Sequence, residues 1–171
     1  MTTIARNTAR ETRIRLACPA DAAAVCAIYA PYVRDTATTF DLEPPTVEEM
    51  RQKIATILEE RPFLVAEIEC ADTRAADATS HVETGDGEAF TVIGYSYASA
   101  FRPRKAYLHS IETSVYLAPE AKGFGLGSRL YGALEEILRL QNVYNANACV
   151  TYIEPADETC PSTSRIFHER R

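Results

Sequence analysis

The sequence lacks the features that place a protein in a membrane or in an oxidising compartment. No apolar run approaches the about 18 residues that a membrane-spanning helix needs, so no such helix is expected. The five cysteines are an odd number without Cys-x-x-Cys spacing, which argues against a disulfide framework and a zinc site. Residues 1–11 have no apolar segment like that of a secretory signal, but they leave an organellar transit peptide open. We therefore expect a cytoplasmic protein with reduced thiols and without a metal.

Basic residues are outnumbered by acidic ones. The chain has 18 Lys and Arg against 24 Asp and Glu, a net charge of −6, which argues against binding nucleic acid or an anionic membrane. Its 46% of hydrophobic and 25% of charged residues are ordinary values for a globular protein. The sequence contains neither repeats nor a Pro/Ser-rich linker. We expect residues 1–11 to be an N-terminal tail and 12–171 to be a single domain.

The apolar periodicity predicts a domain that contains both strands and helices. The expected strands are 13–17, 63–68, 90–100, 107–117 and 148–153, and the expected helices are 19–32, 46–58, 126–140 and 161–170. Pro31 is expected to end the first helix, and Thr46 with Glu49 to form a capping box on the second. Gly94 indicates a bulge or a close approach of two chains. A polar insertion at about 70–88 is expected to be a mobile loop.

The most informative stretch lies between the fourth strand and the third helix. It contains Gly123, Gly125 and Gly127, and such glycines allow positive φ and the close approach of a ligand to the main chain. A helix that begins there points its free N–H groups and its positive dipole end at one place, which suits a phosphate. Lys122 adds a positive charge beside the turn.

Other glycine motifs fit this stretch poorly. A P-loop requires Lys-Ser or Lys-Thr after the glycines, and no such pair follows them. The dinucleotide-binding fingerprint requires Gly-x-Gly-x-x-Gly, whereas the spacing here is Gly-x-Gly-x-Gly. The glycines alone also allow a tight turn that binds nothing.

A resemblance to a known family favours a coenzyme. Residues 122–127 (Lys-Gly-Phe-Gly-Leu-Gly) resemble the Arg/Gln-x-x-Gly-x-Gly/Ala motif of the GNAT N-acetyltransferase superfamily. Segments that resemble its phosphinothricin acetyltransferase-like branch are 39–46, 101–107, 111–116 and 164–169, in the family's order. The resemblance implies the GNAT α/β (α+β) fold, with a mixed, mostly antiparallel sheet flanked by helices. The family continues past the His-Glu pair into further strands, so the C-terminal strands are expected to be missing and the fifth strand to have an exposed edge.

The resemblance also implies acetyl-CoA as a co-substrate, bound mainly by main-chain groups. The implied coenzyme residues are Val115, Tyr116, Leu117, Lys122, Gly123, Phe124, Gly125, Leu126, Gly127, Ser128 and Ser164. The backbone N–H groups near Val115 to Leu117 are the implied donors to the thioester carbonyl. The Asn that the family usually has before the serine is Pro161 here, which leaves Ser162 as a substitute.

Two residues are candidates for proton transfer. In a strand, Glu112 shares its face with Ser114 and Tyr116, where it is either a solvated surface carboxylate or a general base. The resemblance implies the base. His168 matches the family's His-Glu helix and is implied as an acid, a proton relay or a substrate contact, whereas from the pattern alone it is equally an exposed helix residue. His81 and His109 are not candidates.

The acceptor residues implied by the resemblance are Phe40, Arg104 and Tyr107. An Arg in a closed pocket pairs with a carboxylate through two hydrogen bonds, although Arg104 is equally read as a solvated loop residue. The sequence thus favours an enzyme that acetylates a small amino-acid-like amine by direct attack in a ternary complex. The alternatives are polyamine, aminoglycoside or protein N-terminal acceptors, or a non-catalytic acyl-CoA-binding or interaction module. A homodimer is compatible with the exposed edge.

Overall fold

The strands of the described chain form one sheet. The computed structural model describes residues 12–69, 81–83, 89–154 and 163–170. The strands are β1 (Thr12–Leu16), β2 (Phe63–Glu69), β3 (His81–Glu83), β4 (Ala89–Ala100), β5 (Ser110–Leu117) and β6 (Asn145–Ala148). The helices are α1 (Ala22–Asp35), α2 (Val47–Leu58), α3 (Leu126–Leu140) and α4 (Thr163–Glu169), with short 3-10 turns η1 (Pro19–Asp21), η2 (Lys105–Tyr107) and η3 (Pro119–Ala121).

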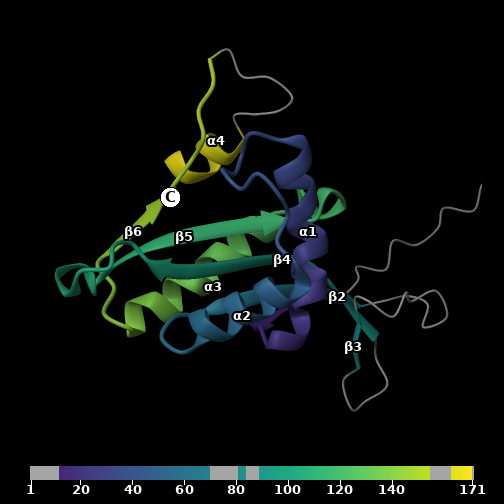
Figure 1. Cartoon of the computed structure of the whole chain (residues 1–171), viewed down its shortest axis with the longest axis horizontal. Helices are drawn as coiled ribbons and strands as arrows, with labels where there is room; N and C mark the ends of the chain where they lie inside the picture. Colours follow the sequence, from purple (N-terminus) through teal and green to yellow (C-terminus); the bar gives the residue numbers. More distant parts are fainter. Residues whose placement is uncertain (1–11, 70–80, 84–88, 155–162, 171) are drawn as a thin grey trace, which may run out of the picture.

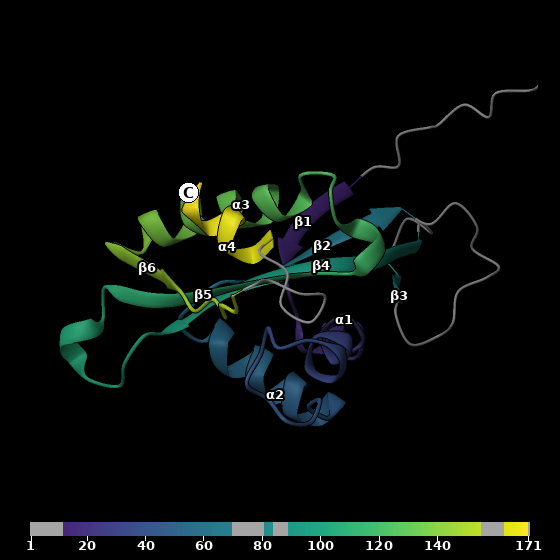
Figure 2. The ribbon, with the colours of Figure 1, turned by 90° about the horizontal axis from the view of Figure 1, so that it is seen from above.

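The sheet is mixed and mostly antiparallel, as expected. Its order is β1-β2-β4-β5-β6, and β3 pairs with β4 beside this path. Among the described strands, β5 and β6 form the parallel pair, and the other pairs are antiparallel. Helices α1 and α2 cover one face of the sheet, and α3 and α4 lie on the other (Figures 1 and 2). The expected layered α/β (α+β) architecture is therefore confirmed.

Each face of the sheet buries the apolar stripe of the helices that cover it. Val25 and Ile28 of α1 and Ile54 of α2 are buried on one face, and Leu130 and Leu134 of α3 on the other. The capping box of α2 is confirmed. The Thr46 hydroxyl accepts a hydrogen bond from the Glu49 N–H at 3.2 Å, and the Glu49 carboxylate accepts one from the Thr46 N–H at 2.7 Å.

Two expected boundaries are wrong. α1 continues past Pro31 to Asp35, and Ala27, whose carbonyl loses its usual partner, is exposed and so open to water. Tyr107, the expected first residue of the fourth strand, instead belongs to η2, and β5 begins at Ser110.

The strand expected at 148–153 is also misplaced. β6 ends at Ala148, its last pair with β5 being Thr113 with Ala148. Tyr152 and Ile153, whose apolar character suggested a strand, are exposed instead. These residues come after β6 has separated from β5, so they have no strand-pairing hydrogen bonds to β5 that would keep them extended.

The described part of the polar insertion is a short strand. Residues 81–83 form β3, paired with β4 from His81 opposite Thr91 to Glu83 opposite Ala89. The remainder of the insertion, at 70–80 and 84–88, lies outside the described residues. The composition of the insertion indicated a loop, but a free side of β4 provides pairing partners for a short strand.

Gly94 marks both a bulge and a close approach, as expected. The register between β2 and β4 shifts beside it, with Ala66 opposite Gly94 and Glu67 opposite Val92. A Cβ atom at Gly94 would lie 2.5 Å from Cδ2 of Leu117 and 3.3 Å from the Tyr116 carbonyl oxygen. Glycine therefore lets β4 and the end of β5 pack closely.

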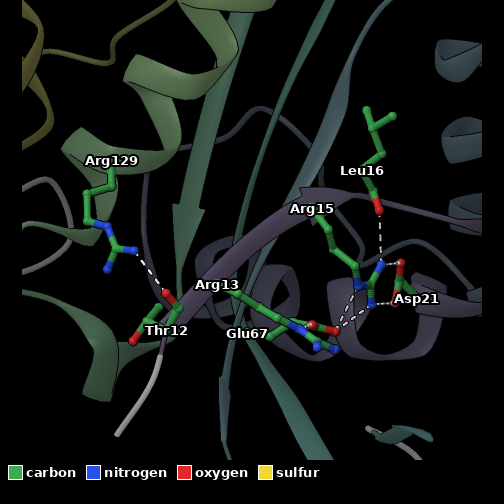
Figure 3. A network of polar contacts seen from close by, with 7 residues as sticks. All are labelled: Thr12, Arg13, Arg15, Leu16, Asp21, Glu67 and Arg129. Carbon is green, nitrogen blue, oxygen red and sulfur yellow. Dashed lines mark hydrogen bonds and ion pairs between the residues drawn. The ribbon is translucent and has the colours of Figure 1, made fainter. Parts of the chain in front are cut away.

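A buried network of charges, not foreseen from the sequence, holds β1, β2 and η1 together (Figure 3). Glu67 is fully buried and accepts hydrogen bonds from Arg13 at 2.6 Å and from Arg15 at 2.6 and 2.9 Å. Arg15 also donates to both oxygens of Asp21, which is 2% exposed, at 2.7 and 2.8 Å. Since α1 follows Asp21 directly, this network fixes the start of the helix that reaches the candidate site.

Candidate functional site

The C-terminal half of β5 has an open edge. β4 pairs with β5 from Ile111 to Leu117, but β6 pairs only with residues 110–113. The N–H of Phe101 bonds to Ser110 O, and that of Ala118 bonds to Ile93 O, so the even-numbered residues of β5 direct their backbone groups at β4. The N–H and C=O groups of Val115 and Leu117 therefore point to the other side, where no described strand pairs with them.

A tyrosine meets one of these two residues. The hydroxyl of Tyr32, on α1, donates to Leu117 O at 2.7 Å and accepts from Leu117 N–H at 3.4 Å. Val115 thus presents its backbone groups at the open edge. Tyr116 differs from both neighbours, because its backbone groups face β4.

The glycine stretch forms a corner between β5 and α3. Gly123 and Gly125 have φ of 86° and 74°, and Gly125 is the N-cap of α3. An added Cβ would meet nothing within 4 Å at either residue, so the left-handed backbone, not crowding, requires glycine there. Gly127 does not use the positive φ that glycine allows. A Cβ there would only touch Leu117 and Phe167, at 3.6 and 3.7 Å.

The corner has the geometry of an anion site. In the described part of the chain, no side chain forms a hydrogen bond at the N-cap of α3, and the first N–H groups of a helix have no partners within the helix. Lys122 and Ser128 are exposed beside them, Phe124 is 82% exposed, and Leu126 is buried. The Arg129 guanidinium donates to Thr12 O at 2.9 Å and ties the first turn of α3 to β1 (Figure 3).

This arrangement fits the coenzyme that the sequence suggested. The open edge ends at Leu117, and the corner begins five residues later at Lys122. A ligand with an amide-bearing arm beside the strand and a diphosphate at the corner would meet main-chain groups at both places. Among the described residues, no group of three or more His, Cys, Asp or Glu side chains is placed to hold a metal ion.

Tyrosines lie on the face of the sheet that α1 covers, near the open edge of β5. The ring of Tyr116 contacts Tyr29 and Tyr32 of α1 edge-on, with centroids 5.0 and 5.1 Å away, and stacks on Tyr95 of β4 at 5.3 Å. Burial raises the pKa of Tyr29 to about 12 and that of Tyr116 well above its usual range. Both phenols therefore stay neutral at neutral pH.

Tyr29 also joins the loop between α1 and α2 to this cluster. Its hydroxyl donates to the Asp41 carboxylate at 2.7 Å and lies 2.6 Å from the Thr39 hydroxyl. Nearby in β4, the Tyr97 hydroxyl lies 3.0 Å from Nζ of Lys53. The sequence indicated only the apolar helical spacing of Tyr29 and Tyr32, so these polar contacts were missed.

Glu112 lies on the α1 and α2 face of the sheet. It is half-buried in β5, in register with Ser99 of β4 and Asn147 of β6. It shares its face with Tyr116, which contacts α1, whereas the neighbouring Thr113 bonds the Tyr131 hydroxyl of α3 at 2.9 Å. The carboxylate thus lies in the half of β5 that pairs with β6, before the open edge begins, and on the side away from α3.

His168 lies on the other face. It is half-buried on α4, with its ring centroid 5.4 Å from that of Tyr131. Ser164 is half-buried on the same short helix, and residues 161 and 162 lie outside the described chain. The structure therefore does not place the side chains of Glu112 and His168 on the same face of the sheet.

The three expected acceptor residues lie in two separate loops. Phe40 is 82% exposed in the loop that follows α1. Arg104 and Tyr107 are exposed in the hairpin between β4 and β5, which projects at the left of Figure 1, and Tyr107 contacts the Phe101 ring at 5.9 Å. His109 bonds the Asn142 carbonyl through Nδ1 at 2.7 Å, a structural contact consistent with its exclusion from the candidates.

Comparisons with known proteins agree on one family. The model of the "Acetyltransferase (GNAT) family" matches residues 42–156. The chain is 36% identical over 138 residues to a phosphinothricin N-acetyltransferase of Streptomyces coelicolor, covering 81% of this chain and 71% of the relative. It is 39% identical over 111 residues to one of Alcaligenes faecalis, covering 64% of this chain and 46% of that relative. The chain therefore spans less than half of the length of the Alcaligenes protein.

Solved structures share the fold. A GNAT-superfamily phosphinothricin acetyltransferase of Sinorhizobium meliloti, solved in complex with AcCoA, matches with a TM-score of 0.71 and 29% identity over 93% of this chain and 72% of that one. A ribosomal-protein-alanine N-acetyltransferase of Brucella melitensis matches with a TM-score of 0.70 and 26% identity over 92% and 82% of the two chains. In the described part of this chain, no helix has both the length and the apolarity to cross a membrane.

Proposed function

Because the chain belongs to the acetyltransferase (GNAT) family, we propose that it transfers the acetyl group of acetyl-CoA to the amine of a small amino-acid-like molecule in a ternary complex. The observation that carries this proposal is the adjacency of the open edge at Val115 to the glycine corner at 122–128. The open edge offers backbone groups for strand-like pairing and the corner offers an anion site, and the two together suit an acyl-CoA. The coenzyme supplies the acetyl group as a thioester.

We assign the coenzyme contacts to main-chain groups first. The N–H groups at the start of α3 and the Lys122 ammonium are the proposed partners of the diphosphate. The N–H of Val115 is the proposed donor to the thioester carbonyl, because it lies at the open edge without a described strand partner. Phe124 and Ser164 are proposed to border the coenzyme without a charged contact.

Glu112 is the proposed general base. An α-amino group titrates at about 7.7–8.0 and a lysine-type amine at about 10.4, so an amine must give up a proton before its nitrogen can attack. The Glu112 carboxylate accepts that proton, directly or through a water. His168 lies across the sheet from it, so its proposed role is on the coenzyme side, as a proton donor or relay.

For the acceptor, the names of the relatives favour a small molecule. Two of them are named phosphinothricin N-acetyltransferases, at 36% and 39% identity, whereas the ribosomal-protein-alanine enzyme matches at 26%. Phe40, Arg104 and Tyr107 are the proposed acceptor contacts. An Arg suits the carboxylate of an amino-acid-like substrate.

The proposal is tested by measuring the release of CoA thiol with a panel of amines. The panel contains phosphinothricin, amino acids, a polyamine, an aminoglycoside and a peptide with N-terminal alanine. Glu112→Gln should lower kcat about 10²- to 10⁴-fold for the best acceptor, with the larger loss at lower pH, where more of the amine is protonated. Glu136→Gln, an exposed position on α3, is the matched control and should leave kcat unchanged.

Three results would contradict parts of the proposal. Binding of acetyl-CoA without amine-dependent thiol release would indicate a binding module. Equal kcat of the wild type and Glu112→Gln would remove Glu112 from the mechanism. Turnover with the peptide alone would replace the small acceptor by a protein N-terminus.

A further inference from the structure

One tyrosine of α1 joins the two halves of the proposed coenzyme site. Tyr32 is half-buried near the end of α1, and its ring lies against Tyr116 at 5.1 Å. Its hydroxyl reaches the last residue of β5, and the face of its ring meets Lys122 at the start of the glycine corner. The end of β5 and the start of the corner thus meet on one side chain of α1, which lies 85 positions before Leu117 in the sequence.

The hydroxyl of Tyr32 occupies backbone groups that would otherwise be open. It donates to Leu117 O at 2.7 Å and accepts from Leu117 N–H at 3.4 Å, so it replaces both bonds that a further strand would make there. It leaves Val115, two residues earlier, with its N–H and C=O at the same edge. The hydroxyl therefore marks where the pairing surface of β5 ends.

The ring of Tyr32 holds the cation of the corner. Nζ of Lys122 lies 4.7 Å from the ring centroid, within the range of a cation–π contact. Lys122 is exposed and follows η3, and the positive φ of the next residue, Gly123, turns the chain away. Since a lysine side chain has many rotamers, a ring that restricts it lowers the entropy lost when an anion binds.

We propose that Tyr32 is a positioning residue for the coenzyme, with separate roles for its hydroxyl and its ring. The hydroxyl fixes the end of β5 so that Val115 alone pairs with the amide-bearing arm. The ring holds Lys122 toward the diphosphate. This inference rests on the proposed function, since both roles concern an acyl-CoA.

The two roles are separable with two substitutions and two ligands. Tyr32→Phe removes the hydroxyl and keeps the ring, whereas Tyr32→Leu removes both. CoA carries the diphosphate and the arm, whereas ADP carries a diphosphate without the arm. Dissociation constants are measured by titration calorimetry on the purified chain, and the melting temperature of each variant is recorded beside them.

Tyr32→Phe should weaken the affinity for CoA about three- to tenfold and leave the affinity for ADP unchanged. This is the size expected for the loss of one hydrogen bond that holds β5 in place for the amide-bearing arm. Tyr32→Leu should also weaken ADP, by about two- to fivefold, because the contact with Lys122 is lost. In turnover, Tyr32→Phe should raise KM for acetyl-CoA more than KM for the amine. A purely structural role would lower the melting temperature without this split.

Tyr29→Phe is the matched control. It removes a hydroxyl from the same helix, but that hydroxyl bonds Thr39 and Asp41 in the loop after α1. The affinities for CoA and ADP should both be unchanged. A loss of CoA affinity equal to that of Tyr32→Phe would show that loosening α1, not the Leu117 contact, is responsible, and would overturn the proposal.

The pairing of Tyr32 with Lys122 is tested by a double-mutant cycle. Lys122→Met should weaken the affinity for ADP. In the double variant, Tyr32→Leu should cause little further loss of this affinity, since both substitutions remove the same contact. Additive losses would overturn the role of the ring. Equal CoA affinity of wild type and Tyr32→Phe would overturn the role of the hydroxyl. A wild-type chain that binds neither ligand would overturn the proposed function itself, together with this inference.

Discussion

The two ends of the sheet treat polar groups in opposite ways. At the β1 end, the carboxylates of Glu67 and Asp21 are buried, and arginines of β1 satisfy both. At the β5 end, backbone groups of Val115 lie at an edge without a described strand partner, and Glu112 is half-buried. The first region uses its hydrogen-bonding capacity for the fold, whereas the second leaves backbone groups that we propose bind a ligand.

The buried network at the β1 end also supports the position of the helix at the open edge of β5. A buried ion pair is not in itself strong evidence of stability, but breaking one leaves an uncompensated charge. The network at β1 therefore fixes η1 and the start of α1, and α1 carries Tyr29 and Tyr32 to the open end. Rigidity at one end supports the geometry of the other.

The largest effect is expected from breaking the network. Glu67→Ala removes the buried carboxylate that Arg13 and Arg15 share, leaving Arg15 with Asp21, and should lower the free energy of unfolding by about 3–5 kcal/mol, measured by urea denaturation. The control is Glu48→Ala, which removes the exposed pair with Arg51 and should cost less than about 1 kcal/mol. Equal losses in the two variants would mean that the buried network is no more costly to break than an exposed ion pair.

A smaller effect is expected at the glycine corner. Gly125→Ala forces a Cβ into left-handed backbone and should lower the free energy of unfolding by about 1–2 kcal/mol, with a weaker affinity for CoA. Gly132→Ala, in the interior of the same helix, where an added Cβ meets nothing within 4 Å, should instead raise it by about 0.5–1 kcal/mol. If Gly125→Ala were as harmless as its control, positive φ would not be the reason for glycine there.

The smallest effect is expected on the pH dependence of stability, through the Asp21 carboxyl. Burial raises the pKa of the Asp21 carboxyl, but hydrogen bonds from Arg15 and the Cys18 N–H outweigh it, so the pKa lies below its usual value. A lowered pKa stabilises the folded state above the unfolded pKa, about 3.9, and this stabilisation is lost as the pH falls through the folded pKa.

Urea denaturation between pH 7 and pH 3 checks this dependence. Asp21→Asn should be less stable than the wild type at pH 7, and the difference should shrink as the pH falls below about 4. For Glu48→Gln, at an exposed position, the difference in free energy of unfolding from the wild type should not shrink as the pH falls. A gap between Asp21→Asn and the wild type that is constant with pH would show that the carboxylate is not the stabilising form.

Much of the fold was predictable because its signals are local. The capping box at Thr46, the apolar stripe of α3 and the close approach at Gly94 each depend on residues near one another in the sequence. The strand expected at 148–153 failed because the departure of β6 from β5 is decided by pairing, not by the residues themselves. β3 was missed for the same reason.

The candidate site was predictable in its parts. The glycine motif placed the corner correctly between a strand and a helix, and alternation along β5 placed Glu112 on the face of Tyr116. Alternation cannot show which helix covers which face, so the placement of His168 on the opposite face could not be foreseen. The contact of Tyr32 with Leu117 joins residues 85 positions apart, beyond any local pattern.

The sequence by itself determined the family, the positions of the long helices and the turn where the backbone must be left-handed. These depend on periodicity, on capping and on the conformational freedom of glycine, which act over a few residues. Only the tertiary structure decided which backbone groups of β5 remain open, which charges are buried together and which tyrosine closes the edge. Those depend on strand pairing and burial, and both bring together residues whose separation in the sequence carries no signal.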